Sequence, residues 1–201
     1  MKGTLFILSS PSGGGKTTIC QAILRQVPSI KRSISYTTRP ARSDELDGSD
    51  YHYISEEEFD KMVAEGKFAE WAVVHKNRYG TPAEFLDRNL KEGYDIILTI
   101  DVQGARNLKA KYADVVTIFI LPPSFAELKE RLVGRGTEGE ALIGERLKRA
   151  KEEVGEALSY DYIIVNEHID QTIEAVKAVI LAERARASRA SAQLLARILE
   201  G

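Results

Sequence analysis

Short apolar runs alternate with longer amphipathic segments along most of the chain. Helical spacing separates the later runs, and such an alternation is typical of a parallel sheet covered by helices. The pattern therefore predicts an α/β fold, with a five-stranded parallel sheet and helices on both faces. The five predicted strands are residues 4–9, 33–36, 94–100, 115–121 and 162–165.

Helix starts are marked by side chains that can accept a hydrogen bond from a backbone N–H. A first helix is predicted over residues 16–26, directly after the first strand. Later starts carry a hydroxyl followed three residues on by a glutamate, which is the capping-box pattern. The four pairs are Ser55 with Glu58, Thr81 with Glu84, Ser124 with Glu127, and Thr137 with Glu140.

Two segments interrupt the alternation of strands and helices. Residues 37–92 contain a polar loop, short strands near 51–54 and 68–74, and two capped helices, so we expect an inserted subdomain there. Residues 124–159 form a charged helical pair with a hinge at Gly134-Arg135-Gly136, as expected of a mobile lid. The core is then residues 1–36, 93–123 and 160–187, followed by a predicted tail helix over 188–201.

Composition excludes several classes of protein. The chain has 201 residues, 43% hydrophobic and 29% charged, which suits one globular core. Its 28 basic and 30 acidic residues argue against a general nucleic-acid-coating role. The single Cys20 allows no internal disulfide and fits a reducing compartment. Apolar runs too short for a bilayer and a strand close to the N-terminus predict a cytoplasmic protein without membrane contact.

Charge is unevenly distributed along the chain. Residues 1–43 contain seven basic residues and no acid, whereas residues 44–60 contain eight acids and no base. Such blocks are usually solvated surface. The basic block here also contains a phosphate-binding motif, which favours a role of its positive charge in binding anions.

The loop at residues 10–17 has the composition of a phosphate-binding loop. It matches G-x-x-x-x-G-K-[ST], except that Ser10 replaces the first glycine. Three consecutive glycines let backbone N–H groups turn toward a phosphate at a helix N-terminus. Lys16 is suited to the β- and γ-phosphates, and the Thr17 hydroxyl is suited to Mg²⁺. The predicted ATP-binding residues here are Ser10, Pro11, Ser12, Gly13, Gly14, Gly15, Lys16, Thr17 and Thr18.

A second phosphate site is indicated downstream. Arg39 and Arg42 flank a proline that stiffens the chain, and arginine suits two-point recognition of a phosphate. A little downstream, the phenols of Tyr51, Tyr53 and Tyr79 and the Thr81 hydroxyl are candidates to complete an anion pocket. On these residues alone, ordinary surface arginines are an equally good interpretation.

Taken together, the motifs of the chain resemble the guanylate kinase family in order and spacing, to about residue 184. The resemblance implies a P-loop NTPase core, a GMP-binding insertion and a helical lid. It also implies transfer of the ATP γ-phosphoryl group to GMP, and to dGMP, giving ADP and GDP with Mg²⁺. The motifs are Ser35-Tyr-Thr-Thr-Arg39-Pro-Ala-Arg42, Gly48-Ser-Asp-Tyr51, Phe68-Ala-Glu70-Trp71, Tyr79-Gly80-Thr81, Asp101-Val-Gln-Gly104, Pro122-Pro-Ser124 and Gly134-Arg135-Gly136.

The resemblance also implies residue roles. On the GMP phosphate we expect Arg39, Arg42, Tyr51 and Tyr79, and on guanine Ser35, Glu70, Thr81 and Asp101. The lid residues Arg135 and Arg146 are expected on the transferring phosphoryl group, with Arg131 beside ATP. The catalytic set is then Lys16, Arg39, Arg135 and Arg146, with Thr17 on the metal.

Two departures and two alternatives accompany this interpretation. Ser10 departs from the loop motif, and Thr99 stands where some relatives carry a second acid before Asp101, which leaves one fewer carboxylate near Mg²⁺. One alternative is a non-catalytic module of the same fold that binds a partner protein, although Lys16 and Thr17 favour an enzyme. The other is a kinase for a different nucleoside monophosphate. The oligomeric state is open.

Overall fold

The structure is a computed structural model that describes residues 2–43, 45–74, 76–134, 140–189 and 199. Its core is the predicted five-stranded sheet, in the order β2-β7-β1-β8-β9, with every neighbouring pair parallel. The strands are β1 (Leu5–Ser9), β2 (Ile30–Arg32), β7 (Asp95–Thr99), β8 (Val115–Leu121) and β9 (Tyr162–Val165).

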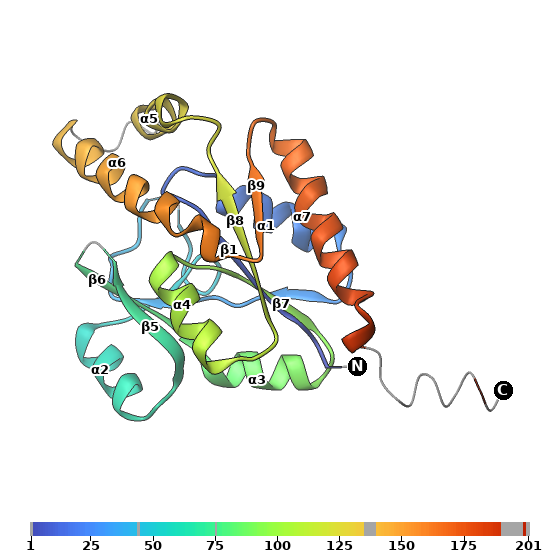
Figure 1. The fold of residues 1–201 in the computed structure, drawn as a ribbon. Helices are drawn as coiled ribbons and strands as arrows, with labels where there is room; N and C mark the ends of the chain where they lie inside the picture. The colour runs from blue at the N-terminus through green and yellow to red at the C-terminus, as the bar shows by residue number, and fades with distance from the viewer. Residues whose placement is uncertain (1, 44, 75, 135–139, 190–198, 200–201) are drawn as a thin grey trace.

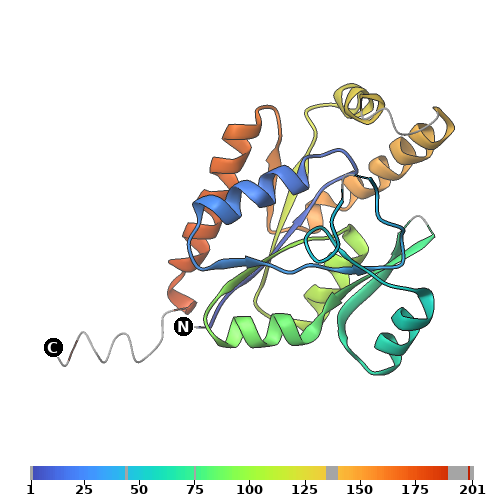
Figure 2. The same ribbon diagram turned by 180° about the vertical axis from the view of Figure 1, so that it is seen from behind.

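Helices cover both faces of this sheet (Figures 1 and 2). On one face, α1 (Lys16–Gln26) and α7 (Ile169–Arg184) bury apolar residues such as Ile23 and Val176. On the other face, α3 (Ala83–Lys91) and α4 (Val102–Lys111) do the same with Leu86 and Leu108. Because successive residues of a strand point to opposite faces, Phe6 and Leu8 belong to the first core and Leu5 and Ile7 to the second. Both faces of the central strand β1 are therefore buried, and its sequence has no alternating polar positions.

A second sheet, of four strands, lies beside the core (Figure 1). Its order is β4-β3-β6-β5, with β3 (Tyr36–Thr37), β4 (His52–Tyr53), β5 (Phe68–Val74) and β6 (Asn77–Pro82). The helix α2 (Glu56–Ala64) follows β4, and the buried ring of Phe59 packs on Phe68 with centroids 4.7 Å apart. The helix α2 and all of this sheet except Tyr36, the first residue of β3, fall within the predicted insertion, whose boundaries remain predictions.

The predicted helical pair near the end of the chain is α5 (Phe125–Val133) and α6 (Glu140–Gly155), followed by a short 3-10 turn, η1 (Ala157–Ser159). Leu128 and Leu132 of α5 pack against Ile143 and Ala150 of α6. The Ser124 side chain caps α5 by accepting from the Glu127 N–H, as Ser55 caps α2, so both caps are confirmed. Figure 1 shows this pair beyond the end of β8, away from the chain termini.

Two sequence predictions about local structure were wrong. The strand predicted over 33–36 lies instead at Ile30–Arg32, because Ile30 is the residue that enters the core. Ser33 still bonds to the Ile97 carbonyl, and the chain then leaves for the second sheet. The Thr81 cap is also absent: α3 begins after Pro82 without a side-chain cap, since the Thr81 hydroxyl donates to Glu70.

Several predictions concern residues outside those described. The Thr137 cap and most of the hinge at 134–136 fall there, as does nearly all of the tail helix predicted over 188–201. Before that tail, α7 is followed by a 3-10 turn, η2 (Ala187–Arg189), where Arg189 donates to the Thr4 hydroxyl at 2.6 Å. Across the described residues, we find no helix both long and apolar enough to cross a bilayer.

Candidate active site

The glycine-rich loop joins β1 to α1, as predicted. Gly13 and Gly15 have φ of 88° and 94°, a region that favours glycine. Ser10, in the place of the first glycine of the motif, is not among the described residues with positive φ. Its side chain packs beside Gly14, where an added Cβ would lie 2.4 Å from the Ser10 Oγ. Ser10 therefore fits the loop conformation. Its side chain is also one reason why position 14 requires a glycine.

Lys16 folds back over this loop. Its Nζ donates to the Ser10 carbonyl and lies 3.2 Å from the Ser10 hydroxyl. Thr17 and Thr18 are exposed in the first turn of α1, at its positive end. The loop thus presents a cation, hydroxyls and a helix N-terminus together, which is a set of groups suited to binding phosphates.

Asn166, just after β9, holds the outer side of the phosphate loop. This residue was not predicted from the sequence. Its buried Nδ2 donates to the Gly14 carbonyl at 3.2 Å, and its Oδ1 accepts from the Thr172 hydroxyl at 3.0 Å. Arg131 on α5 donates to the Asn166 carbonyl at 3.3 Å, so the structure places this predicted ATP-side residue at the edge of the loop. The signal in the sequence was a polar residue directly following a buried strand.

The helix α6 also reaches the phosphate loop. Arg146 NH1 lies 3.4 Å from the Ser12 hydroxyl, which brings one predicted lid arginine to the predicted ATP site. On α5, Leu132 would contact a side chain added at Gly13 at 3.3 Å, so this helix packs closely on the loop. The other predicted lid arginine, Arg135, lies outside the described residues.

Glu70 and Thr81, two predicted guanine-binding residues, are cross-strand neighbours in β5 and β6. Thr81 Oγ1 donates to Glu70 Oε1 at 2.6 Å, and both residues are buried. Burial, and then the nearby negative charge of Asp101, raise the pKa of Glu70 to about 7 against the pull of the Thr81 hydrogen bond. The Glu70 carboxyl therefore holds a proton far more readily than an exposed glutamate does.

Asp101 lies beside Glu70 at the start of α4. Its Oδ1 caps this helix by accepting from the Gly104 N–H at 3.0 Å, and an added Cβ on Gly104 would lie 3.0 Å from Glu70 Oε2. The two carboxylates thus meet at one helix N-terminus, where negative charge is favoured. Ser35, the fourth predicted guanine residue, directly precedes β3, whose Tyr36 pairs with Gly80 next to Thr81. The fold therefore brings Glu70, Thr81 and Asp101 together, and Ser35 directly precedes a strand that pairs with β6.

A charge network that the sequence analysis did not predict joins Asp101 to the helical pair. Arg149 of α6 has its NH2 3.3 Å from Asp101 Oδ2 and its Nε 3.4 Å from Glu153 Oε1. Burial, with the charge of Asp101, raises the pKa of Glu153, although Lys16 and Arg149 oppose the shift. These contacts place Lys16, Asp101 and the C-terminal half of α6 in one electrostatic neighbourhood.

Three tyrosines surround Arg39, and we call these four residues the arginine–tyrosine cluster. The Arg39 guanidinium carbon lies 5.6 Å from the Tyr51 ring centroid and 5.8 Å from that of Tyr53. The Tyr51 and Tyr79 rings meet edge-on with centroids 5.7 Å apart. Arg42, by contrast, is about half exposed, with 48% of its side-chain surface accessible. The structure thus brings Arg39, Tyr51 and Tyr79 together and leaves Arg42 at the rim.

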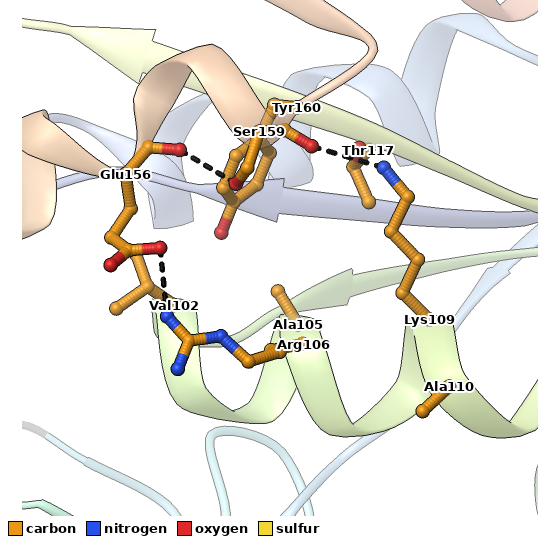
Figure 3. Close-up of a pocket in the computed structure, with 9 residues that line it drawn as sticks. All are labelled: Val102, Ala105, Arg106, Lys109, Ala110, Thr117, Glu156, Ser159 and Tyr160. Carbon is orange, nitrogen blue, oxygen red and sulfur yellow. Dashed lines mark hydrogen bonds and ion pairs between the residues drawn. The ribbon is translucent and has the colours of Figure 1, made fainter.

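A separate pocket of about 310 Å³ lies between α4 and the η1 turn, beside these predicted sites (Figure 3). Its two cations are already paired: Arg106 lies 2.8 Å from Glu156, and Lys109 lies 3.0 Å from the Ser159 carbonyl and 3.4 Å from Asp161. None of the predicted ATP or GMP residues lines it, so we assign neither nucleotide to this pocket.

Comparison with known proteins agrees with this arrangement. The sequence model of the family described as guanylate kinase matches residues 2–183. A guanylate kinase from Syntrophotalea carbinolica is 52% identical over 93% of this chain and 89% of its own, and one from Geobacter sulfurreducens is 48% identical over 94% and 93%. The crystal structure of guanylate kinase from Anaplasma phagocytophilum superposes with a TM-score of 0.81 at 36% identity, covering 94% of this chain and 89% of that chain.

The family match spans nearly all of the described chain, and the structural neighbour shares both its fold and more than a third of its residues. The chain belongs to the guanylate kinase family, phosphotransferases that act on GMP with ATP.

Proposed function

We propose that this chain transfers the γ-phosphoryl group of ATP to GMP, with the phosphate loop binding ATP and the second sheet binding GMP. The observation that carries the proposal is the buried Glu70, paired with Thr81 and adjacent to Asp101. A buried carboxylate such as Glu70 is stabilised by a ligand that donates hydrogen bonds to it. Guanine supplies such donors.

Guanine presents N1–H and an exocyclic amine as adjacent donors, and one carboxylate can accept from both. Adenine would instead face Glu70 with a lone pair at N1, leaving a buried anion unpaired. Polar mismatch of this kind discriminates far more strongly than shape. We therefore assign base selection to Glu70, with Ser35, Thr81 and Asp101 supporting it.

We assign binding of the GMP phosphate to the arginine–tyrosine cluster, with Arg42 at its rim. The nucleophile is an oxygen of the GMP phosphate, which is anionic near neutral pH, so no general base is required. Catalysis then depends on positioning two anions and neutralising the charge on the transferring group. We assign this neutralisation to Lys16, Arg39, Arg135 and Arg146, and the ATP side to the remaining loop residues and Arg131.

Mg²⁺ is proposed as the cofactor, entering with ATP. Among the described residues no group of three or more acidic, histidine or cysteine side chains could hold a metal by itself. That fits an ion bound mainly by phosphate oxygens and water, with the exposed Thr17 hydroxyl as the protein ligand. When bound, Mg²⁺ would neutralise phosphate charge as a Lewis acid.

Acceptor specificity tests the proposal. With Mg-ATP present, ADP formation should be rapid with GMP, slower with dGMP, and near background with AMP, UMP and CMP. Rapid turnover of another monophosphate would reassign the base site. Absence of turnover with every acceptor, together with retained GMP binding, would favour the non-catalytic module.

A further inference from the structure

The carboxylate of Glu45 lies at the centre of the contacts that hold Arg39. Both of its oxygens accept from Arg39 NH2, at 2.8 and 2.9 Å. Oε2 also accepts from the Tyr53 hydroxyl at 2.8 Å and from the Arg42 backbone N–H at 2.9 Å. One side chain therefore ties together the guanidinium, strand β4 and the loop that carries Arg42.

These contacts are well sheltered from water. The side chains of Glu45 and Arg39 are 13% and 15% exposed. Burial opposes ionisation of Glu45, but the hydrogen bonds from Arg42, Tyr53 and Arg39 outweigh it and keep the pKa of this carboxyl below its ordinary value. Glu45 is therefore a stable anion throughout the neutral range.

Arg39 keeps donors for a ligand while it is held in this way. Besides the Glu45 contacts, its NH1 donates to the Pro40 carbonyl at 2.8 Å. The Tyr79 hydroxyl makes a further hydrogen bond to Arg39. A guanidinium carries five N–H groups, more than these four bonds use. An arginine fixed on one edge and open on the other is already ordered before a ligand arrives, so less conformational entropy is lost on binding.

We propose that Glu45 is a positioning residue, which with Tyr53 pre-orders the Arg39 guanidinium for the phosphate of the acceptor nucleotide. The inference rests on the proposed function, because it assumes that Arg39 binds that phosphate. The alternative role is that the Glu45 carboxylate occupies the position of the GMP phosphate on Arg39 and must be displaced when GMP binds. The backbone contact to Arg42 and the hydroxyl contact to Tyr53 favour positioning, since a mere surrogate for a ligand would not need to fix the loop.

Glu45→Gln tests this role, since it keeps the shape but leaves one oxygen to accept from three donors. We expect the KM for GMP to rise about tenfold, with kcat and the KM for ATP changed less than about twofold. Because the carboxylate stays ionised, the effect should be constant between pH 6.5 and 8.5. Glu57→Gln, which removes an exposed acid from α2 in the same region, is the matched control and should behave as wild type.

Guanosine provides the readout that a merely structural defect would not produce. It lacks the phosphate, so Glu45→Gln should weaken GMP binding about tenfold and leave guanosine binding unchanged. Equal loss for both ligands would mean a distorted subdomain and would overturn the proposal. Tighter GMP binding would show that Glu45 competes with the phosphate. Unchanged affinities for both GMP and guanosine would show that Glu45 neither positions Arg39 nor competes with the phosphate.

Two further variants separate the possible failures. Tyr53→Phe removes a single donor to Glu45. It should lower the ratio of GMP to guanosine affinity as Glu45→Gln does, but by less, and so it tests the positioning role if Glu45→Gln does not fold. Arg39→Ala should abolish the preference for GMP over guanosine, and adding Glu45→Gln to it should change nothing more. If Arg39→Ala leaves the ratio intact, the phosphate role of Arg39 fails in the proposed function, independently of Glu45.

Discussion

In the proposed base site, the ionisation of the buried Glu70 carboxyl decides whether a guanine base is bound. Burial and Asp101 raise its pKa to about 7, whereas acceptance of two guanine hydrogen bonds requires the ionised form. Binding must therefore release a proton wherever Glu70 is neutral beforehand. The preference for guanine and the pH dependence of binding have one physical origin.

Glu70→Gln should lose about 1.5–3 kcal/mol of GMP binding, the range for a hydrogen bond to a charged group. In the wild type, the dissociation constant should rise about tenfold from pH 8 to pH 6 because of this carboxyl alone. The GMP phosphate also titrates near pH 6, so the measured quantity is the difference between wild type and variant across that range, by calorimetry. An identical pH profile for both proteins would remove Glu70 from the site.

Glu70→Gln should weaken GMP binding but should raise the stability of the ligand-free protein above neutral pH. A carboxyl whose pKa is raised by folding favours the folded state fully below its unfolded pKa, and this contribution is lost as the pH rises through the folded value near 7. Moving from a pKa of 4.5 to about 7 corresponds to about 3 kcal/mol. Ligand-free Glu70→Gln should therefore unfold at a higher temperature than wild type at pH 8, but not at pH 4.5.

Residues that act through others were the hardest to predict from sequence. Glu70, Arg39 and Lys16 are chemically distinctive within their motifs, so the sequence alone singles them out, and their roles remain predictions from the resemblance. Glu45 lies in an acidic run that we interpreted as solvated surface, and only the folded loop brings it to Arg39. Thr81 shows the reverse error: its capping pattern is present in sequence, but its hydroxyl is turned toward the buried Glu70, to which it donates, and does not accept from the first amides of α3.

At the scale of elements, α6 is the segment that touches both halves of the site. Arg146 contacts the phosphate loop, and Arg149, one turn later, reaches Asp101. Residues three apart on a helix share a face, so both arginines point to the same side. The helix can therefore align the phosphate loop with the base site.

Arg149→Ala should lower kcat about fivefold, because α6 loses its tie to Asp101 and Arg146 is less well aligned with ATP. The KM for ATP should change less than about twofold, since the loop contacts remain. Lys148→Ala removes an equal charge from an exposed position on the same helix and serves as control. Steady-state kinetics in which the two variants match each other would show that the Asp101 contact has no role in catalysis.

Elements were predicted best where one residue pattern dominated. The bounds of α1, β5, β8 and β9 agree with their predictions, because continuous apolar runs or a glycine-rich start define them. The strands β3 and β6 were missed, since their buried positions hold threonine and glycine rather than large apolar residues. Their pairing depends on partners distant in sequence, which no local pattern reports.

At the scale of the whole molecule, the phosphate loop belongs to the core sheet, whereas most of the predicted GMP residues belong to the second sheet or its loops. Hydrolysis of ATP requires water at the position that the acceptor phosphate takes, and a site completed only when both nucleotides bind admits little water. We therefore expect ADP release from Mg-ATP alone to run below about 1% of the rate with GMP. Hydrolysis without GMP at a comparable rate would contradict a site assembled from both sheets.

The two sheets share no strand. The chain leaves the first beyond Ser33 and returns through α3, so no ladder of backbone hydrogen bonds spans the boundary. Turning one sheet relative to the other would disturb side-chain contacts, such as the bond from Lys111 to the Ala69 carbonyl and the packing of Ala69 in the core beside Leu108. A change in the angle between the sheets would therefore repack side chains at this boundary while leaving the strand pairings within each sheet intact.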